Sequence, residues 1–297
     1  MVSDTDPFDG RTRVVGGHRM HYLDLGDGPP LVMVHGNPSW SFYYRHAVAA
    51  FRDRYRVVVP DHIGCGRSDK PSDTDYEYRL RRRIDDLEEL LDGLGVDSEL
   101  TLVVHDWGGM IGFGYAARHP DRIARLVVMN TAAFHLPAGI PFMAPLKLAR
   151  GPFGAVLVRG FTAFAVGATR LCVTRIAMPP AVRAGYLAPY DSWRNRIAVH
   201  RFVQDIPLVP GDPSYETVTR VQEALPQFVD TPMLICWGHR DFVFDTRFLA
   251  EWRQRFPGAQ VVDFPDCGHY VLEDATDEVI AAMTAFFDTN PIGGGRR

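Results

Sequence analysis

Three ionisable side chains follow apolar runs of the sequence, at the points where buried parallel strands would end. Asp106 ends the run LTLVVHD, Asp241 comes shortly after TPMLICWG, and His269 comes shortly after AQVVDF. Because ligands bind at the carboxyl ends of the strands of a parallel sheet, we expect the three side chains to lie close together there. Their order along the chain is that of a nucleophile, an acid and a base.

The residue types predict covalent catalysis by a carboxylate. A carboxylate is ionised at neutral pH, so Asp106 needs no base before it attacks an electrophilic carbon. The attack leaves an ester on the protein, which water activated by His269 can cleave. Asp241 would hold the tautomer of His269 and stabilise its protonated form. A serine in place of Asp106 would have indicated acyl transfer instead.

The sequence around Asp106 has the pattern of a sharp turn between a buried strand and a helix. The stretch VVHDWGGMIG carries Asp106 at the apex that a nucleophile elbow requires. A second turn, HGNP, ends another apolar run. We expect the backbone N–H groups of Trp107 and Asn37 to form an oxyanion hole, in which one donor contributes on the order of 10²–10³ in rate.

Each of these assignments has a structural alternative. Asp106 could be only the N-cap of the following helix, because aspartate is favoured there. His269 could be a hydrogen-bonded structural histidine, and Asp245 could replace Asp241 as the acid. His35 and His105 are expected to be structural, since neither has metal-ligand spacing with another histidine. The sequence predicts no metal site and no cofactor.

Apolar runs alternate with helical patterns along most of the chain and predict an α/β fold. We expect a mostly parallel eight-stranded sheet with helices on both faces. The alternation stops near Asn130 and resumes at TPMLICWG, which indicates an inserted helical cap. The expected division is a core at 1–134, a cap at 135–225, the rest of the core at 226–290 and a flexible tail at 291–297. One helix is expected over DYEYRLRRRIDDLEELLDGLG. Its two charged blocks are expected to form its solvated face; they are Arg81 to Arg83, and Asp85, Asp86, Glu88 and Glu89.

Composition excludes several classes of protein. The chain has 297 residues, is 46% hydrophobic and carries a formal net charge of −4, which gives no reason to expect a nucleic-acid partner. Its first residues lack the apolar segment of a secretory signal. The apolar stretch between Gly151 and Pro180 is interrupted by arginines and is too short for a membrane span. We interpret it as a core or lid helix, the alternative being a membrane-surface or partner-binding face.

The four cysteines, Cys65, Cys172, Cys236 and Cys267, are far apart in the sequence. They lack the spacing of a metal or redox motif, so we expect small buried apolar residues in a reducing compartment. The expected location is the cytoplasm.

The motifs together resemble the haloalkane dehalogenase family of the α/β-hydrolase superfamily, across nearly the whole chain. The resemblance lies in Asp106-Trp107 and in the turn from His35 to Pro38. It implies that Asn37 and Trp107 bind the departing anion, which suits two neutral N–H donors. Some relatives carry the acid at the position of Asn130, which cannot act as a carboxylate.

Longer strings resemble the third subfamily, and they look closest to its β-lactone decarboxylases. The strings are WSFYYR, DHIGCGRSDKP, MNTAAF, APYDSWRNRIAVHRFVQDIPL and DFVFD. The resemblance implies conversion of a long-chain cis-β-lactone to an alkene and carbon dioxide, with an apolar cap that suits two alkyl chains. It implies a small hydrophobic substrate, and a homo-oligomer or a complex with pathway enzymes.

Two other activities stay open at this stage. The first is haloalkane dehalogenation, which would use the same Asp106, His269 and Asp241 with Asn37 and Trp107. The second is epoxide hydrolysis, for which Tyr186 and Tyr190 are the tyrosines that could protonate the epoxide. Epoxide hydrolases usually have an aromatic residue at the position of Asn37, which makes this alternative the weaker one.

Overall fold

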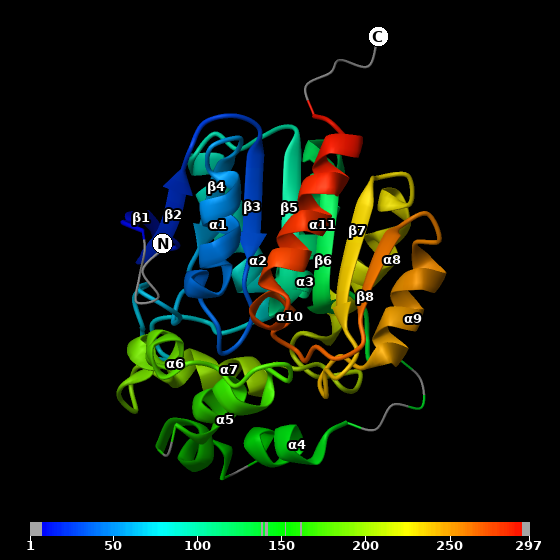
Figure 1. The fold of residues 1–297 in the computed structure, drawn as a ribbon. Helices are drawn as coiled ribbons and strands as arrows, with labels where there is room; N and C mark the ends of the chain where they lie inside the picture. The colour runs from blue at the N-terminus through cyan, green and yellow to red at the C-terminus, as the bar shows by residue number, and fades with distance from the viewer. Residues whose placement is uncertain (1–7, 138, 140–141, 152, 161, 293–297) are drawn as a thin grey trace.

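A twisted sheet of eight strands forms the centre of the protein (Figure 1). The computed structural model describes residues 8–137, 139, 142–151, 153–160 and 162–292. The expected tail at 291–297 therefore lies mostly outside the described residues. The strands, in chain order, are β1 (Arg11–Val15), β2 (His18–Leu25), β3 (Pro30–Val34), β4 (Arg56–Pro60), β5 (Leu100–Asp106), β6 (Ile123–Thr131), β7 (Met233–Gly238) and β8 (Gln260–Phe264).

The strands follow the order β1-β2-β4-β3-β5-β6-β7-β8 across the sheet. Only β2 is antiparallel to its neighbours, β1 and β4; all other pairs are parallel. Gly16 and Gly17 have φ values of 54° and 85° and make the tight turn between β1 and β2. The mostly parallel eight-stranded sheet confirms the fold expected from the apolar runs.

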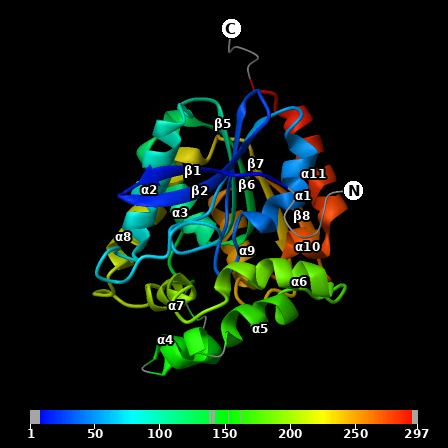
Figure 2. The same cartoon turned by 90° about the vertical axis from the view of Figure 1, so that its left-hand side faces the viewer.

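Helices cover both faces of the sheet (Figures 1 and 2). The longer helices are α1 (Arg45–Phe51), α2 (Leu80–Gly93), α3 (Trp107–Arg118), α4 (Ala144–Arg150), α5 (Ala163–Leu171), α6 (Pro180–Leu187), α7 (Ile197–Gln204), α8 (Tyr215–Ala224), α9 (Thr246–Arg255) and α11 (Thr276–Thr289), with the short α10 (Val271–Asp274). One hydrophobic cluster joins α2, α3, α8 and α9 to the sheet, and a second joins α1 and α11 to its other face.

Short helical turns connect these elements. They are η1 (Ser41–Tyr44), η2 (Pro120–Arg122), η3 (Val156–Gly160), η4 (Ala188–Tyr190) and η5 (Leu225–Phe228). The helix η3 is of the π type, and the other four are 3-10 helices.

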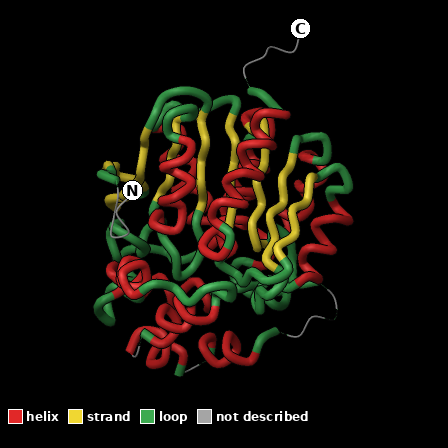
Figure 3. Tube along the Cα trace, in the orientation of Figure 1, coloured by secondary structure: helices red, strands yellow, loops and turns green. Residues whose placement is uncertain are grey.

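The helices α4 to α7 lie across the carboxyl ends of the parallel strands, as a layer separate from those on the faces of the sheet (Figures 1 and 3). The next helix, α8, packs instead on α3, where Val218 and Val221 share a cluster with Phe113. We therefore propose that the cap comprises α4 to α7 and that α8 belongs to the α/β core.

Two charged side chains of α2 are buried, so the expectation that both charged blocks face solvent was wrong. Arg83 and Asp86 are 1% and 2% exposed. Arg83 comes three residues after Leu80 in the helix, and Asp86 comes three residues after Arg83. Positions three residues apart share a helical face, so both charged side chains lie on the same face as the buried Leu80. Asp86 accepts hydrogen bonds from Tyr76 and Arg82, at 2.6 and 2.8 Å. The guanidinium of Arg83 lies 3.6 Å from the ring centre of Phe202.

All four cysteines are free and buried, as their spacing predicted. Within the part of the chain that the structure describes, no helix is sufficiently long and apolar to cross a bilayer.

We expect Leu102→Ala, in the middle of β5, to lower the free energy of unfolding by about 2–5 kcal/mol, because Leu102 is fully buried and its loss leaves a cavity. Val14→Ala, on the exposed face of β1, is the control and should change the free energy by about 0.5 kcal/mol or less. Urea denaturation followed by circular dichroism measures both. Equal effects of the two substitutions would contradict this assignment of the core.

Candidate active site

Asp106 is held at the apex of a sharp turn between β5 and α3. Its φ is 52° and its ψ −127°, a backbone conformation that L-residues rarely adopt. Two close approaches require glycine: a Cβ on Gly108 would lie 2.0 Å from the carbonyl oxygen of Val34, and one on Gly36 would lie 2.0 Å from Asp106 Oδ1. The hydroxyl of Thr131 donates to the carbonyl oxygen of Asp106. The elbow that the sequence predicts is therefore present.

Asp106, Asp241 and His269, which the sequence predicts to lie close together, meet at the carboxyl edge of the sheet. His269 Nδ1 lies 2.7 Å from Asp241 Oδ2, and His269 Nε2 lies 3.5 Å from Asp106 Oδ2. All three are buried. The backbone N–H of Asn37 donates to Asp106 Oδ1 at 2.6 Å. Oδ1 is thus engaged by the N–H of Asn37, and Oδ2 is the oxygen that faces His269.

Asp106, His269 and Asp241 stabilise one another's charged forms. Burial acts to lower the pKa of His269, but Asp241 and Asp106 outweigh it and raise that pKa to about 10. Burial acts to raise the pKa of Asp106, yet the hydrogen bond and charge of His269 keep it below its usual value. At neutral pH, therefore, an imidazolium lies between two carboxylates.

The structure distinguishes the two candidate acids. Asp245 caps α9 by accepting from the backbone N–H of Arg247 and pairs with the side chain of that residue. Asp241 is the carboxylate on His269, and it also accepts from the backbone N–H of Val243 at 2.6 Å.

Asn130 takes part in the site in a way that its sequence position did not reveal. Its Nδ2 donates to Asp241 Oδ2 and to the carbonyl oxygen of Gly238, both at 3.0 Å. Its Oδ1 accepts from the N–H of Gly238 at 2.8 Å. Asn130 thus fixes both the acid and the end of β7. Its place near the end of β6, the strand beside β7 in the sheet, brings its side chain to Asp241 and Gly238.

Asn37 and Trp107 lie beside Asp106 and line the same cavity. One N–H of the Asn37 side chain donates to the carbonyl oxygen of Val199 in α7, at 3.1 Å, which links the site to the cap. The Trp107 ring packs against Phe202, also in α7, with ring centres 5.2 Å apart. Helix α7 therefore orients both proposed anion donors.

The remaining candidate residues hold the surrounding structure. His105 Nε2 lies 2.9 Å from the carbonyl oxygen of His269, and His35 Nδ1 lies 2.7 Å from that of Gly36. The hydroxyl of Tyr186 donates to Glu273, and that of Tyr190 to the carbonyl oxygen of Ser39. Neither tyrosine is among the residues that line the cavity beside Asp106, so neither is placed to protonate an epoxide.

A cavity of about 740 Å³ extends from Asp106 into the cap. Asn37, Asp106, Trp107 and His269 form its polar end. The rest of the wall is mostly apolar and comes from α4, η3, α5 and the core, including Leu146, Leu157, Phe164, Phe134, Phe244 and Phe248. The volume and lining are those of a site for a small apolar molecule.

Asp274 joins the cap to the loop that carries His269. Its carboxylate accepts from the N–H groups of Thr174 and Arg175 in the cap, at 2.9–3.1 Å. It also accepts from the N–H of Gly268, at 2.7 Å, next to His269. Across the described residues, no group of three or more His, Cys, Asp or Glu side chains is arranged to hold a metal ion.

Comparisons with known proteins identify the same fold. Residues 29–276 match the family model of the alpha/beta hydrolase fold. A haloalkane dehalogenase from Agrobacterium tumefaciens C58 superimposes with a TM-score of 0.84 over 95% of this chain and 96% of that structure, at 22% identity, which shows the shared fold.

Relatives at higher identity cover almost the whole chain. Two proteins named cis-3-alkyl-4-alkyloxetan-2-one decarboxylase are similar to it: that of Shewanella oneidensis is 56% identical over 96% of this chain and 90% of its own, and that of Xanthomonas campestris pv. campestris is 49% identical over 95% and 96%. Haloalkane dehalogenase 2 of Mycobacterium bovis is 31% identical over 95% and 96%.

The chain therefore belongs to the α/β-hydrolase family. Within it, the chain belongs to the branch that contains these oxetanone decarboxylases and, at greater distance, the haloalkane dehalogenases.

We expect the stabilisation contributed by His269 to be lost at high pH. Because its pKa in the folded protein, about 10, lies above the ordinary value of 6.5, this contribution is complete below about pH 6.5 and disappears as the pH rises through 10. The difference in unfolding free energy between the wild type and His269→Gln should shrink across that interval. Asp241→Asn removes one of the two carboxylates that raise the pKa of His269. In that background, the pH interval over which the contribution of His269 is lost should be narrower. A difference independent of pH would contradict the assignment.

Proposed function

We propose that this protein is a β-lactone decarboxylase, which converts a cis-3,4-dialkyl-oxetan-2-one to an alkene and carbon dioxide. The observation that carries the proposal is an ionised Asp106 at the polar end of a deep apolar cavity. The names of the two relatives at 56% and 49% identity support it, since an oxetan-2-one is a four-membered β-lactone.

In the first step, Asp106 Oδ2 attacks the alkyl-bearing ring carbon next to the ring oxygen, C4, and not the carbonyl carbon. A new carbon–oxygen bond forms to Asp106, the old one breaks, and its electrons pass to the ring oxygen. The product is an alkyl ester of Asp106 that carries a free carboxylate. In this proposal Asn37 and Trp107, which line the cavity beside Asp106, donate hydrogen bonds to the developing carboxylate.

In the second step, the ester loses carbon dioxide. The bond between the carboxylate and its neighbouring carbon breaks, its electrons form the double bond, and Asp106 leaves as a carboxylate. No water or proton is consumed. Inversion in the first step followed by anti elimination in the second converts a cis-lactone to a cis-alkene.

The raised pKa of His269 supports this order of events. A cationic imidazolium 3.5 Å from Asp106 Oδ2 stabilises the departing carboxylate. Asp241 and Asn130 keep the imidazolium in place.

The lining of the cavity supports a β-lactone with two alkyl chains as the substrate. Its apolar wall accommodates two alkyl substituents, while the lactone ring lies at the polar end beside Asp106. The four free, buried thiols fit a reducing compartment, and we therefore place the protein in the cytoplasm.

A second candidate activity is haloalkane dehalogenation. Asn37 and Trp107 could hold a halide in place of a carboxylate, and haloalkane dehalogenase 2 of M. bovis shares 31% identity with this chain. In that reaction water must cleave the ester. Formation of the ester removes the charge of Asp106, which lowers the pKa of His269 and favours the neutral base.

We expect the protein to release alkene and carbon dioxide from a long-chain cis-β-lactone, measured by gas chromatography. Asp106→Ala removes the nucleophile and should lower the rate by roughly 10⁴-fold or more. Asp121→Ala removes an exposed carboxylate in η2, at the end of β6 opposite the site; it is the matched control and should retain the wild-type rate. Absence of alkene with the wild-type protein would exclude the decarboxylase.

Water enriched in heavy oxygen separates the two activities. Decarboxylation returns both original oxygens to Asp106, so its peptide should keep its mass after turnover of the lactone. Dehalogenation of a bromoalkane would place one heavy oxygen in the Asp106 carboxylate, because water attacks the ester at that carbon. Mass spectrometry of the peptide reads the result. Label in Asp106 after turnover of the lactone would contradict the two steps given above.

A further inference from the structure

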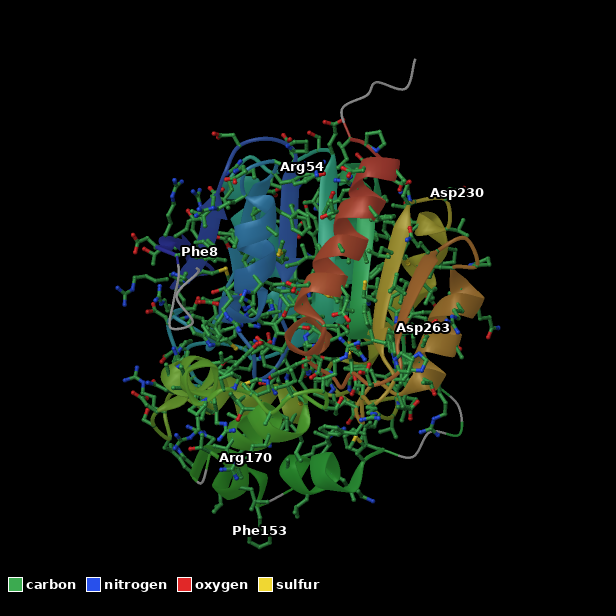
Figure 4. The ribbon with its side chains drawn as sticks, viewed as in Figure 1. Phe8, Arg54, Phe153, Arg170, Asp230 and Asp263 are labelled. Carbon is green, nitrogen blue, oxygen red and sulfur yellow. The ribbon has the colours of Figure 1, made fainter. Side chains whose placement is uncertain are left out.

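The outer surface of the cap exposes several large apolar side chains. Phe153 is 73% exposed, Leu171 62% and Leu148 58%. Val156 and Trp193 are also exposed. Figure 4 shows Phe153 at the end of the cap that is farthest from the sheet, with its ring pointing away from the protein. We call these five residues the cap patch. Large exposed apolar patches mark interaction sites.

Two members of the cap patch, Val156 and Trp193, lie close together beside η3. The Cβ position of Gly160 lies 3.7 Å from the Trp193 ring and 3.8 Å from the Val156 side chain, so the two side chains flank the same point. The guanidinium of Arg159 lies 4.6 Å from the centre of the Trp193 ring. Tryptophan is enriched at the boundary between membrane and water, and arginine is common on the polar face of interfacial helices.

The cap is also strongly basic in a chain that is acidic overall. Residues 135–210 contain nine lysines and arginines but only two acidic residues, whereas the whole chain has a net charge of −4. Lys147, Arg170 and Arg194 are exposed, and none of them has an ion-pair partner among the described residues. Figure 4 shows Arg170 on the same lower part of the cap as Phe153.

The cap patch includes part of the rim of the cavity. Leu148 and Leu171 line the cavity beside Asp106 and are nevertheless more than half exposed, so the cavity reaches the surface between them. A molecule that leaves the site along this path emerges next to the exposed apolar side chains.

We propose that the cap docks on an anionic lipid bilayer, with Phe153 and Trp193 in the interface and Lys147, Arg170 and Arg194 against the headgroups. The positive charge complements anionic lipid, and the apolar side chains add burial in the acyl boundary. In this orientation the cavity opens toward the bilayer, into which an apolar molecule partitions. The inference rests on the cap patch and its charge, and it holds whichever reaction Asp106 performs.

Flotation with vesicles tests the proposal on the full-length protein. Vesicles of phosphatidylcholine with phosphatidylglycerol should bind the wild type, and vesicles of phosphatidylcholine alone should bind it far less. Raising the salt to about 1 M should weaken binding, because the electrostatic part is then screened. The triple variant K147E/R170E/R194E should lower the partition coefficient on the order of 100-fold or more, since each basic residue near an anionic surface contributes separately.

A matched triple variant controls for net charge. R13E/R81E/R220E makes the same change of charge at exposed positions outside the cap and should bind anionic vesicles much more strongly than the cap variant does. F153S/W193S removes two apolar side chains of the cap patch. It should weaken the part of vesicle binding that persists at high salt. Both cap variants should keep the wild-type thermal melt and the wild-type rate on substrate in detergent solution.

Three results would overturn the proposal. The first is equal binding to neutral and anionic vesicles, and the second is equal loss of binding in the two triple variants. The third is an absence of vesicle binding by the wild type. If F153S/W193S then changed the sedimentation coefficient, the cap patch would be an interface between copies of this chain.

Discussion

The site depends on one backbone conformation, the positive φ of Asp106 at the end of β5. It lifts the carboxylate above the edge of the sheet, toward His269 and the cavity. The conformation is possible because the neighbouring chain comes very close: β3 passes beside Gly108, and Gly36 lies against the carboxylate itself. Thr131 at the end of β6 holds the carbonyl oxygen of Asp106. Strain at one residue is thus maintained by the rigid strands on either side of it.

The same packing makes a buried group of charges possible. Asp106, His269 and Asp241 lie in a row with almost no exposure, and moving such charges out of water is costly unless each is paired. Here the imidazolium is shared by two carboxylates, and backbone N–H groups complete the pairing of both. Because Asn130 also donates to Asp241, the acid has a fixed orientation before any substrate arrives.

The elements that the sequence predicted are those whose signal is local. Each buried strand is an uninterrupted apolar run, and the chemistry-bearing residues follow such runs, so both the sheet and the group of Asp106, His269 and Asp241 could be placed without coordinates. The choice between Asp241 and Asp245 required the loop geometry after β7, which no periodicity encodes. The burial of Arg83 depends on Phe202, a partner in α7 more than a hundred residues away. The bond between Asn37 and Val199 is equally non-local.

The carboxylate of Asp274 has a consequence for engineering. Since it binds the cap at Thr174 and Arg175 and the histidine loop at Gly268, the cap is not a module that can be exchanged at its sequence boundaries alone. A chimera that grafts a foreign cap onto this core would have to carry two correctly placed backbone donors opposite Asp274. Without them the imidazole would lose its alignment, however well the new lid matched its intended substrate.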